Sequence, residues 1–113
     1  MNTDPLTWTE FERVEIRVGT VLEAEHFAEA RRPAIKLRID FGDHGIRKSS
    51  AQITDRYVPE ELVGRQVVAV TNFPPKQIAT MMSECLVLGA VGDAKLVTLL
   101  APDAAVPNGT RIG

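Results

Sequence analysis

Basic side chains alternate with apolar ones in two neighbouring stretches of the sequence, residues 34–41 and 46–53. Lys36 and Arg38 lie two positions apart in the first stretch, and because successive side chains of a β-strand point to opposite faces, both are expected on one face. The matching positions of the second stretch carry one cation and two neutral hydrogen-bonding groups: Lys48, Ser50 and Gln52. A hairpin of the two stretches would gather these groups on one surface.

This mixture of groups suits contacts to a sugar-phosphate backbone. Cations supply the affinity for phosphates, and hydroxyl and amide groups fix the position of the ligand. Aromatic residues make up only 5% of the chain, so a grip that stacks successive bases of a single strand is poorly supported. A structured RNA held by its backbone and shape fits better. An ordinary polar exterior of a barrel remains the alternative.

A long apolar-rich segment, residues 72–84, predicts a second kind of surface. It carries four large apolar side chains: Phe73, Ile78, Met81 and Met82. Methionines on a loop can form an adaptable surface for varied polypeptides. The alternative is that these side chains close one end of the domain, since they would otherwise be exposed to water.

The residues that enzymes commonly use do not form a recognisable site. Neither His26 nor His44 has the spacing to a second ligand that a zinc site needs. Ser49 and Ser50 lie outside any Gly-x-Ser-x-Gly motif, and no phosphate-binding loop is present. We therefore expect no catalytic residue, no metal and no cofactor, and we expect any activity to be independent of ATP.

Charge and composition describe the surroundings in which the chain would work. The formal net charge is -2, from 13 basic and 15 acidic residues, so only a local basic patch could attract an anionic partner. Residues 31–48 provide one, with six cations against two acids. The single cysteine, the lack of a bilayer-length apolar run and a start unlike a signal peptide favour a cytoplasmic protein without membrane insertion.

The pattern of elements predicts an all-β domain. Thr9 to Glu12 has the signature of a helix start, and Pro59 to Leu62 that of a second short helix. Six stretches are strand candidates: residues 14–22, 34–41, 46–53, 66–72, 85–89 and 96–100. Gly19 is expected to bend the first of them. The prediction is a five-stranded OB-fold β-barrel with one or two short helices, and a six-stranded sandwich is the competing topology.

Several motifs in order along the chain resemble the CsaA family of export-related chaperones. They are Glu15-Ile16-Arg17-Val18-Gly19, Arg32-Pro33-Ala34, Ile39-Asp40-Phe41-Gly42, Ser49-Ser50-Ala51-Gln52-Ile53-Thr54, the stretch from Asn72 to Ile78, and the stretch from Ser83 to Gly89. The resemblance covers about residue 11 to the end. We expect an N-terminal tail and short helix start at 1–10, and one tRNA-binding-type OB-fold domain at 11–113. The tail that ends in Ile112 is expected to be a C-terminal segment used in dimerisation.

The same resemblance implies a function. The family is similar to the tRNA-binding domain appended to methionyl-tRNA synthetases, and its members are homodimers implicated in binding tRNA and in holding unfolded export substrates. Asn72, Pro75, Lys76 and Ser83 match the loop of the appended domains, whereas Pro74, Gln77, Cys85 and Leu86 depart from it, as they do in the chaperones. The RNA-binding hypothesis rests on nine residues: Arg17, Lys36, Arg38, Lys48, Ser50, Gln52, Asn72, Lys76 and Ser83. A peptide-binding or docking module without physiological RNA binding is the alternative.

Overall fold

The computed structural model describes residues 4–113, apart from the side chain of Lys95. Its helical segments are the α-helices α1 (Trp8–Glu12) and α2 (Pro59–Leu62) and the 3₁₀ turns η1 (Gly42–His44) and η2 (Asp93–Lys95). The strands of the main sheet are β1 (Ile16–His26), β2 (Ile35–Asp40), β3 (Ile46–Ala51), β4 (Gln66–Val70), β7 (Leu86–Val87) and β10 (Arg111–Ile112). Two separate hairpins are β5 (Lys76–Ile78) with β6 (Met81–Ser83), and β8 (Gly89–Val91) with β9 (Val97–Leu99).

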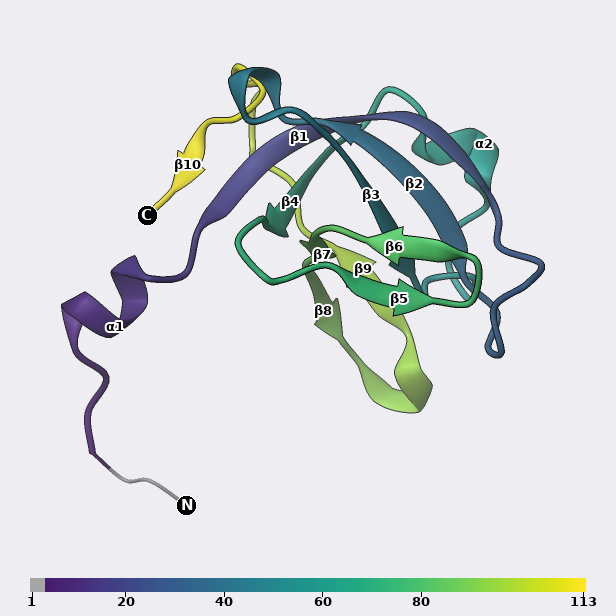
Figure 1. Cartoon of the computed structure of the whole chain (residues 1–113), viewed down its shortest axis with the longest axis horizontal. Helices are drawn as coiled ribbons and strands as arrows, with labels where there is room; N and C mark the ends of the chain where they lie inside the picture. Colours follow the sequence, from purple (N-terminus) through teal and green to yellow (C-terminus); the bar gives the residue numbers. More distant parts are fainter. Residues whose placement is uncertain (1–3) are drawn as a thin grey trace.

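The main sheet is antiparallel and curls into a nearly closed barrel (Figure 1). Its strand order is β3-β2-β1-β4-β7, and β10 pairs with the first residues of β1. The two outer strands are joined where the Ser49 hydroxyl donates to the Cys85 carbonyl at 3.0 Å and the Glu84 amide donates to the Lys48 carbonyl at 2.8 Å. The expected five-stranded barrel with two short helices is confirmed.

The interior of the barrel is filled by alternate residues of its strands. On β2 the buried positions are Ile35, Leu37 and Ile39, and the positions between them are half-buried or exposed. Leu62 of α2 is also fully buried and belongs to the same core. The alternation that predicted this strand is the direct result of a sheet with one dry face and one wet face.

Gly19 has a different role from the one expected. The strand shifts register between Val21 and Glu23, so the irregularity lies after Gly19 and not at it. Gly19 is instead a point of close packing, because a Cβ atom there would lie 2.6 Å from Cγ2 of Ile39 and 2.8 Å from the ring of Phe41. The glycine is needed for the space that two core side chains occupy.

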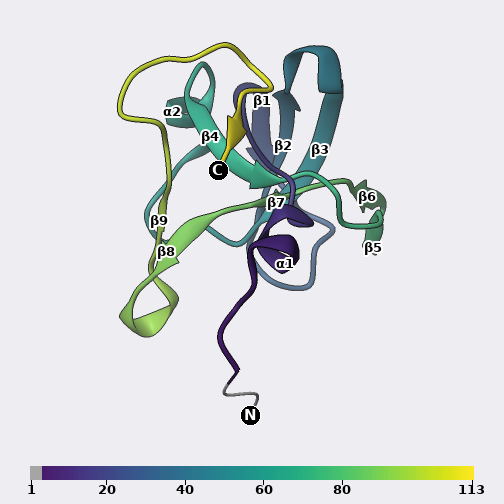
Figure 2. The same cartoon turned by 90° about the vertical axis from the view of Figure 1, so that its left-hand side faces the viewer.

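The first helix begins two residues earlier than expected. Thr7, not Thr9, is the N-cap, and its hydroxyl accepts a hydrogen bond from the Glu10 amide at 3.2 Å while Glu10 bonds back to the Thr7 amide at 3.0 Å. The spacing of threonine and glutamate is the same in both pairs, so the sequence offered two frames for one capping box. Helix α1 contains no buried residue; it projects from the barrel in Figure 1 and faces the viewer in Figure 2.

None of the described helices is long and apolar enough to cross a membrane.

Candidate nucleic-acid interface

The outer faces of β2 and β3 bring the predicted cations and hydrogen-bonding groups together. Lys36 lies directly opposite Ser50, and Arg38 lies directly opposite Lys48. Directly opposed residues of antiparallel strands share a face, so the gathering of these four side chains on one outward surface is confirmed. We call these four residues, with Gln52 just beyond β3, the β2–β3 face.

Two of the cations on this face are already paired. Lys36 Nζ lies 2.9 Å from Glu25 Oε1, and Arg38 Nη1 donates to Glu23 Oε1 at 2.6 Å. The hydrogen bond from Lys36 to Glu25 raises the pKa of the lysine, with the nearby charges of Glu25 and Glu29 adding to it. The glutamates occupy positions on β1 opposite their partners, and their carboxylates offset much of the attraction for a phosphate.

The partner acids were missed by the reasoning from sequence, although the signal was present. Glu23 and Glu25 are spaced two apart on β1, as Lys36 and Arg38 are on β2. In an antiparallel pair, two such patterns in register form cross-strand ion pairs. The register itself depends on the irregularity after Val21, which local alternation does not reveal.

The hairpin β5–β6 extends this surface beside β3. Lys76 pairs with Ser83 across the hairpin, and the Lys48 amide donates to Glu84 Oε1 at 3.0 Å next to it. Lys76 is exposed, and neither its ammonium nor that of Lys48 bonds to any described residue. These two lysines therefore remain available to a ligand. The hydroxyl of Ser83, opposite Lys76, donates a long hydrogen bond of 3.4 Å to the Cys85 carbonyl.

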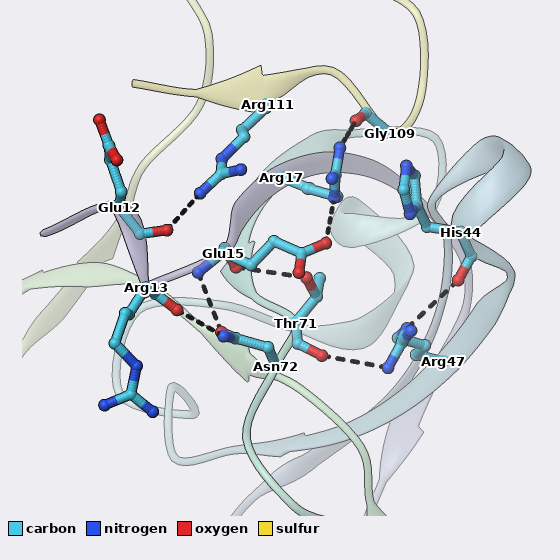
Figure 3. A network of polar contacts seen from close by, with 10 residues as sticks. All are labelled: Glu12, Arg13, Glu15, Arg17, His44, Arg47, Thr71, Asn72, Gly109 and Arg111. Carbon is cyan, nitrogen blue, oxygen red and sulfur yellow. Dashed lines mark hydrogen bonds and ion pairs between the residues drawn. The ribbon is translucent and has the colours of Figure 1, made fainter. Parts of the chain in front are cut away.

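Arg17 and Asn72 lie in a different place, in a network that joins the two ends of the chain (Figure 3). Arg17 Nε donates to Glu15 Oε1 at 2.7 Å and its Nη1 donates to the Gly109 carbonyl at 2.8 Å. Only 14% of the Arg17 side chain is exposed. The hydrogen bond from Arg17 also lowers the pKa of Glu15.

Both polar atoms of the Asn72 side chain make hydrogen bonds. Its oxygen accepts from the Glu15 amide at 2.9 Å, and its nitrogen donates to the Arg13 carbonyl at 2.6 Å. Two further arginines of this network donate to backbone carbonyls: Arg47 to Thr71 and Arg111 to Glu12. Asn72 holds the segment before β1 to the end of β4, and Arg17 and Arg111 hold the C-terminal tail to β1 and α1. The structure therefore does not bring Arg17 and Asn72 to the β2–β3 face.

The four apolar candidates divide into two pairs. Met81 is buried and Ile78 half-buried, both in a small cluster with Phe27 and Ala34. Phe73 and Met82 are exposed, at 54% and 38%. The exposed Phe73 lines an apolar groove of about 610 Å³ together with Pro74, Pro75, Lys76, Gln77, Ser83, Cys85 and Leu86.

No group of three or more histidine, cysteine, aspartate or glutamate side chains within the described part of the chain is arranged to hold a metal ion.

The comparison with known families identifies the class of protein. The family described as tRNA binding domain matches residues 16–111, which include the whole barrel. The chain belongs to this family. It is 40% identical over 103 residues to a methionine–tRNA ligase of Methanopyrus kandleri, and 39% identical over 101 residues to that of Bdellovibrio bacteriovorus. In both comparisons the match covers about nine-tenths of this chain but 15% of the ligase.

Solved structures narrow the likeness further. The chaperone CsaA from Bacillus anthracis superposes with a TM-score of 0.92 at 54% identity, covering 97% of this chain and all of the chaperone. The CsaA chaperone protein from Picrophilus torridus gives 0.88 at 48% identity, with 96% and 100% covered. A MetRS related protein from Pyrococcus horikoshii gives 0.87 at 30% identity, with 98% and 100% covered. The resemblance to CsaA chaperones stated from the motifs is confirmed.

Proposed function

We propose that this protein binds tRNA without catalysing a reaction, through the β2–β3 face and the adjoining hairpin β5–β6. The observation that carries the proposal is the group of outward lysines and hydroxyls on neighbouring strands, with Lys48 and Lys76 free of ion pairs to described residues. Membership in the tRNA-binding family supports it. The affinity would come from phosphate neutralisation, and the small number of free cations predicts moderate binding that depends on salt.

A salt titration against total tRNA tests this function. We expect Lys48→Ala with Lys76→Ala to reduce the slope of log K against log salt by about 1.5 units, since each phosphate contact contributes about 0.7–0.9. Glu23→Gln with Glu25→Gln should tighten binding, because these changes release Lys36 and Arg38 from their ion pairs. Absent or salt-insensitive binding of the unmodified protein would rule the proposal out.

A second proposed activity is the ATP-independent holding of unfolded, export-bound polypeptides. It is supported by the apolar groove beside Phe73 and by the similarity to CsaA chaperones. Phe73→Ser with Leu86→Ser should reduce the suppression of aggregation of an unfolded client in the absence of ATP. Val91→Ser is a suitable control, since Val91 is 77% exposed but does not line the groove. If the control and the groove variant suppress aggregation equally, the groove is not the holding surface.

We also propose that the protein works in the cytoplasm as a homodimer. Helix α1 supports self-association, because none of its residues is buried and Trp8 is 83% exposed. Trp8→Ser should shift the sedimentation coefficient towards that of the monomer, and a protein already monomeric at micromolar concentration would contradict the proposal. The alternative role, a module that docks on a larger partner without binding RNA, predicts capture of that partner in the absence of tRNA binding.

A further inference from the structure

A second groove, which shares Gln77 with the apolar one, lies between the loop of residues 27–34 and the hairpin β5–β6. Its volume is about 390 Å³, within the range of small-ligand sites. Its polar lining comes from three parts of the chain: Arg31 and Arg32 of the loop, Ser50 and Gln52 at the end of β3, and Gln77 of β5. We call these five residues and the space between them the arginine groove.

The two walls of this groove are fixed to each other by packing. Phe27, Ala34 and Met81 form a buried cluster, and the partly buried Ala30 and Ile78 pack against it. The loop is also closed on itself, because the Phe27 amide donates to the Ala34 carbonyl at 3.0 Å. The arginines therefore extend from a loop whose base is anchored, and the groove does not depend on a mobile hairpin.

The charge of the groove is positive and uncompensated. Arg31 and Arg32 are both exposed, and neither guanidinium bonds to any residue that the structure describes. No acidic residue lines the groove. This distinguishes the two arginines from Lys36 and Arg38, whose charges are engaged by glutamates of β1. An anion would thus meet two free guanidinium groups here, each with a donor fork that matches the oxygens of a phosphate.

The neutral groups of the groove can recognise a sugar. The side chains of Ser50 and Gln52 bond to no other described residue. Gln77 donates its amide nitrogen to the Ala79 carbonyl at 2.7 Å, which leaves its side-chain oxygen able to accept. Hydroxyl and amide groups of this kind both donate to and accept from a ribose 2′-hydroxyl. No aromatic ring lines the groove, so it offers no platform for stacking a base.

We propose that the arginine groove binds a phosphate–ribose unit of a structured RNA, with Arg31 and Arg32 on the phosphate and Ser50, Gln52 and Gln77 around the sugar. This inference rests on the proposed tRNA binding and adds Arg31, Arg32 and Gln77 to the contact surface. It places the strongest phosphate contact beside the loop 27–34, and not on the paired cations at the centre of β2.

The test compares two double variants of the full chain that lose the same charge. Arg31→Ala with Arg32→Ala removes the groove cations, and Arg56→Ala with Arg65→Ala removes two exposed cations near α2, outside the groove. Affinity for total tRNA is measured at several salt concentrations, with thermal unfolding as a check on folding. We expect the groove variant to lose about 1.5 units of slope and the control less than about 0.5, since only direct contacts release counterions. Arg31→Lys with Arg32→Lys should retain most of the slope.

Each other outcome has a distinct meaning. Equal losses in the two double variants would overturn the groove as a contact site while leaving tRNA binding intact. Failure of the unmodified protein to bind tRNA would overturn both the function and the groove. If polyglutamate bound the unmodified protein as tightly as tRNA at equal ionic strength, and bound Arg31→Ala with Arg32→Ala weakly, the groove would be a site for acidic peptides and the RNA assignment would be wrong.

Discussion

The cations of the β2–β3 face point outward from the same sheet, but they differ in what their side chains contact. Lys36 interacts with Glu25 and lies 5.3 Å from the centre of the Phe27 ring, whereas Lys48 bonds to no described residue through its side chain. An incoming phosphate competes with a carboxylate at the first residue and only with water at the second. The face on which each cation lies could be predicted from its position in the sequence. Its availability to a phosphate could not, because that depends on a neighbour on another strand.

Cys85 illustrates a second effect of surroundings on a single side chain. Burial raises the pKa of its thiol to about 11 from an ordinary value of 9.0. At pH 8 the thiolate fraction should be about 100-fold lower than for an exposed thiol, and access is also restricted. We expect Ellman's reagent to label the folded protein slowly and the unfolded protein rapidly. Labelling of the folded protein at the rate of a free thiol would contradict this.

The raised pKa of Cys85 also makes the stability of the protein depend on pH. The folded state keeps the proton more tightly than the unfolded state, so the contribution of this group is complete below about pH 9. It is lost as the pH rises towards 11. Replacement of Cys85 by alanine should flatten that part of the curve of unfolding free energy against pH.

At the level of elements, the hairpin β5–β6 shows where local patterns stop being informative. The sequence predicts a loop over residues 72–84, whereas the structure forms two paired strands there. Its turn contains Ala79 at a φ of 48°, a conformation for which glycine or asparagine would have been the expected signal. By contrast, the strict alternation of residues 34–41 predicted β2 well, and Pro59 with two following acids predicted α2. The hairpin is specified by its packing, which no local pattern carries.

Met81 should be the residue that holds this hairpin in place. It is 8% exposed and packs in the cluster with Phe27 and Ala34, whereas its neighbour Met82 is 38% exposed. We expect Met81→Ala to cost about 2 kcal/mol of unfolding free energy and to increase amide hydrogen exchange at residues 76–83. Met82→Ala is the matched control and should change stability by less than about 0.5 kcal/mol. Equal effects would show that the cluster does not anchor the hairpin.

Across the whole molecule, the barrel could be predicted from the sequence. The polar network that joins residues 12–17 to residues 109–111 could not. Arg17 and Asn72 belong to the RNA-binding hypothesis, Arg17 as a cation and Asn72 as a match to the loop of the appended tRNA-binding domains. The structure uses both for internal bonds, and Arg17 reaches a carbonyl 92 residues away. Periodicity describes neighbours along one strand, so it contains no information about such distant partners. Likewise, Arg31 and Gln77 come together only through the packing of the loop on the hairpin.

The pairing of β10 with β1 affects how this protein folds while it is being synthesised on the ribosome. Ile16 pairs with Ile112 and Arg17 with Arg111, so the first strand gains these neighbours only after Arg111 and Ile112 have been synthesised. Gly109 is synthesised 92 residues after Arg17, and at a translation rate of about 5–20 residues per second this interval is on the order of ten seconds. During that interval the nascent chain carries an incomplete strand edge, which is open to pairing with other emerging polypeptides.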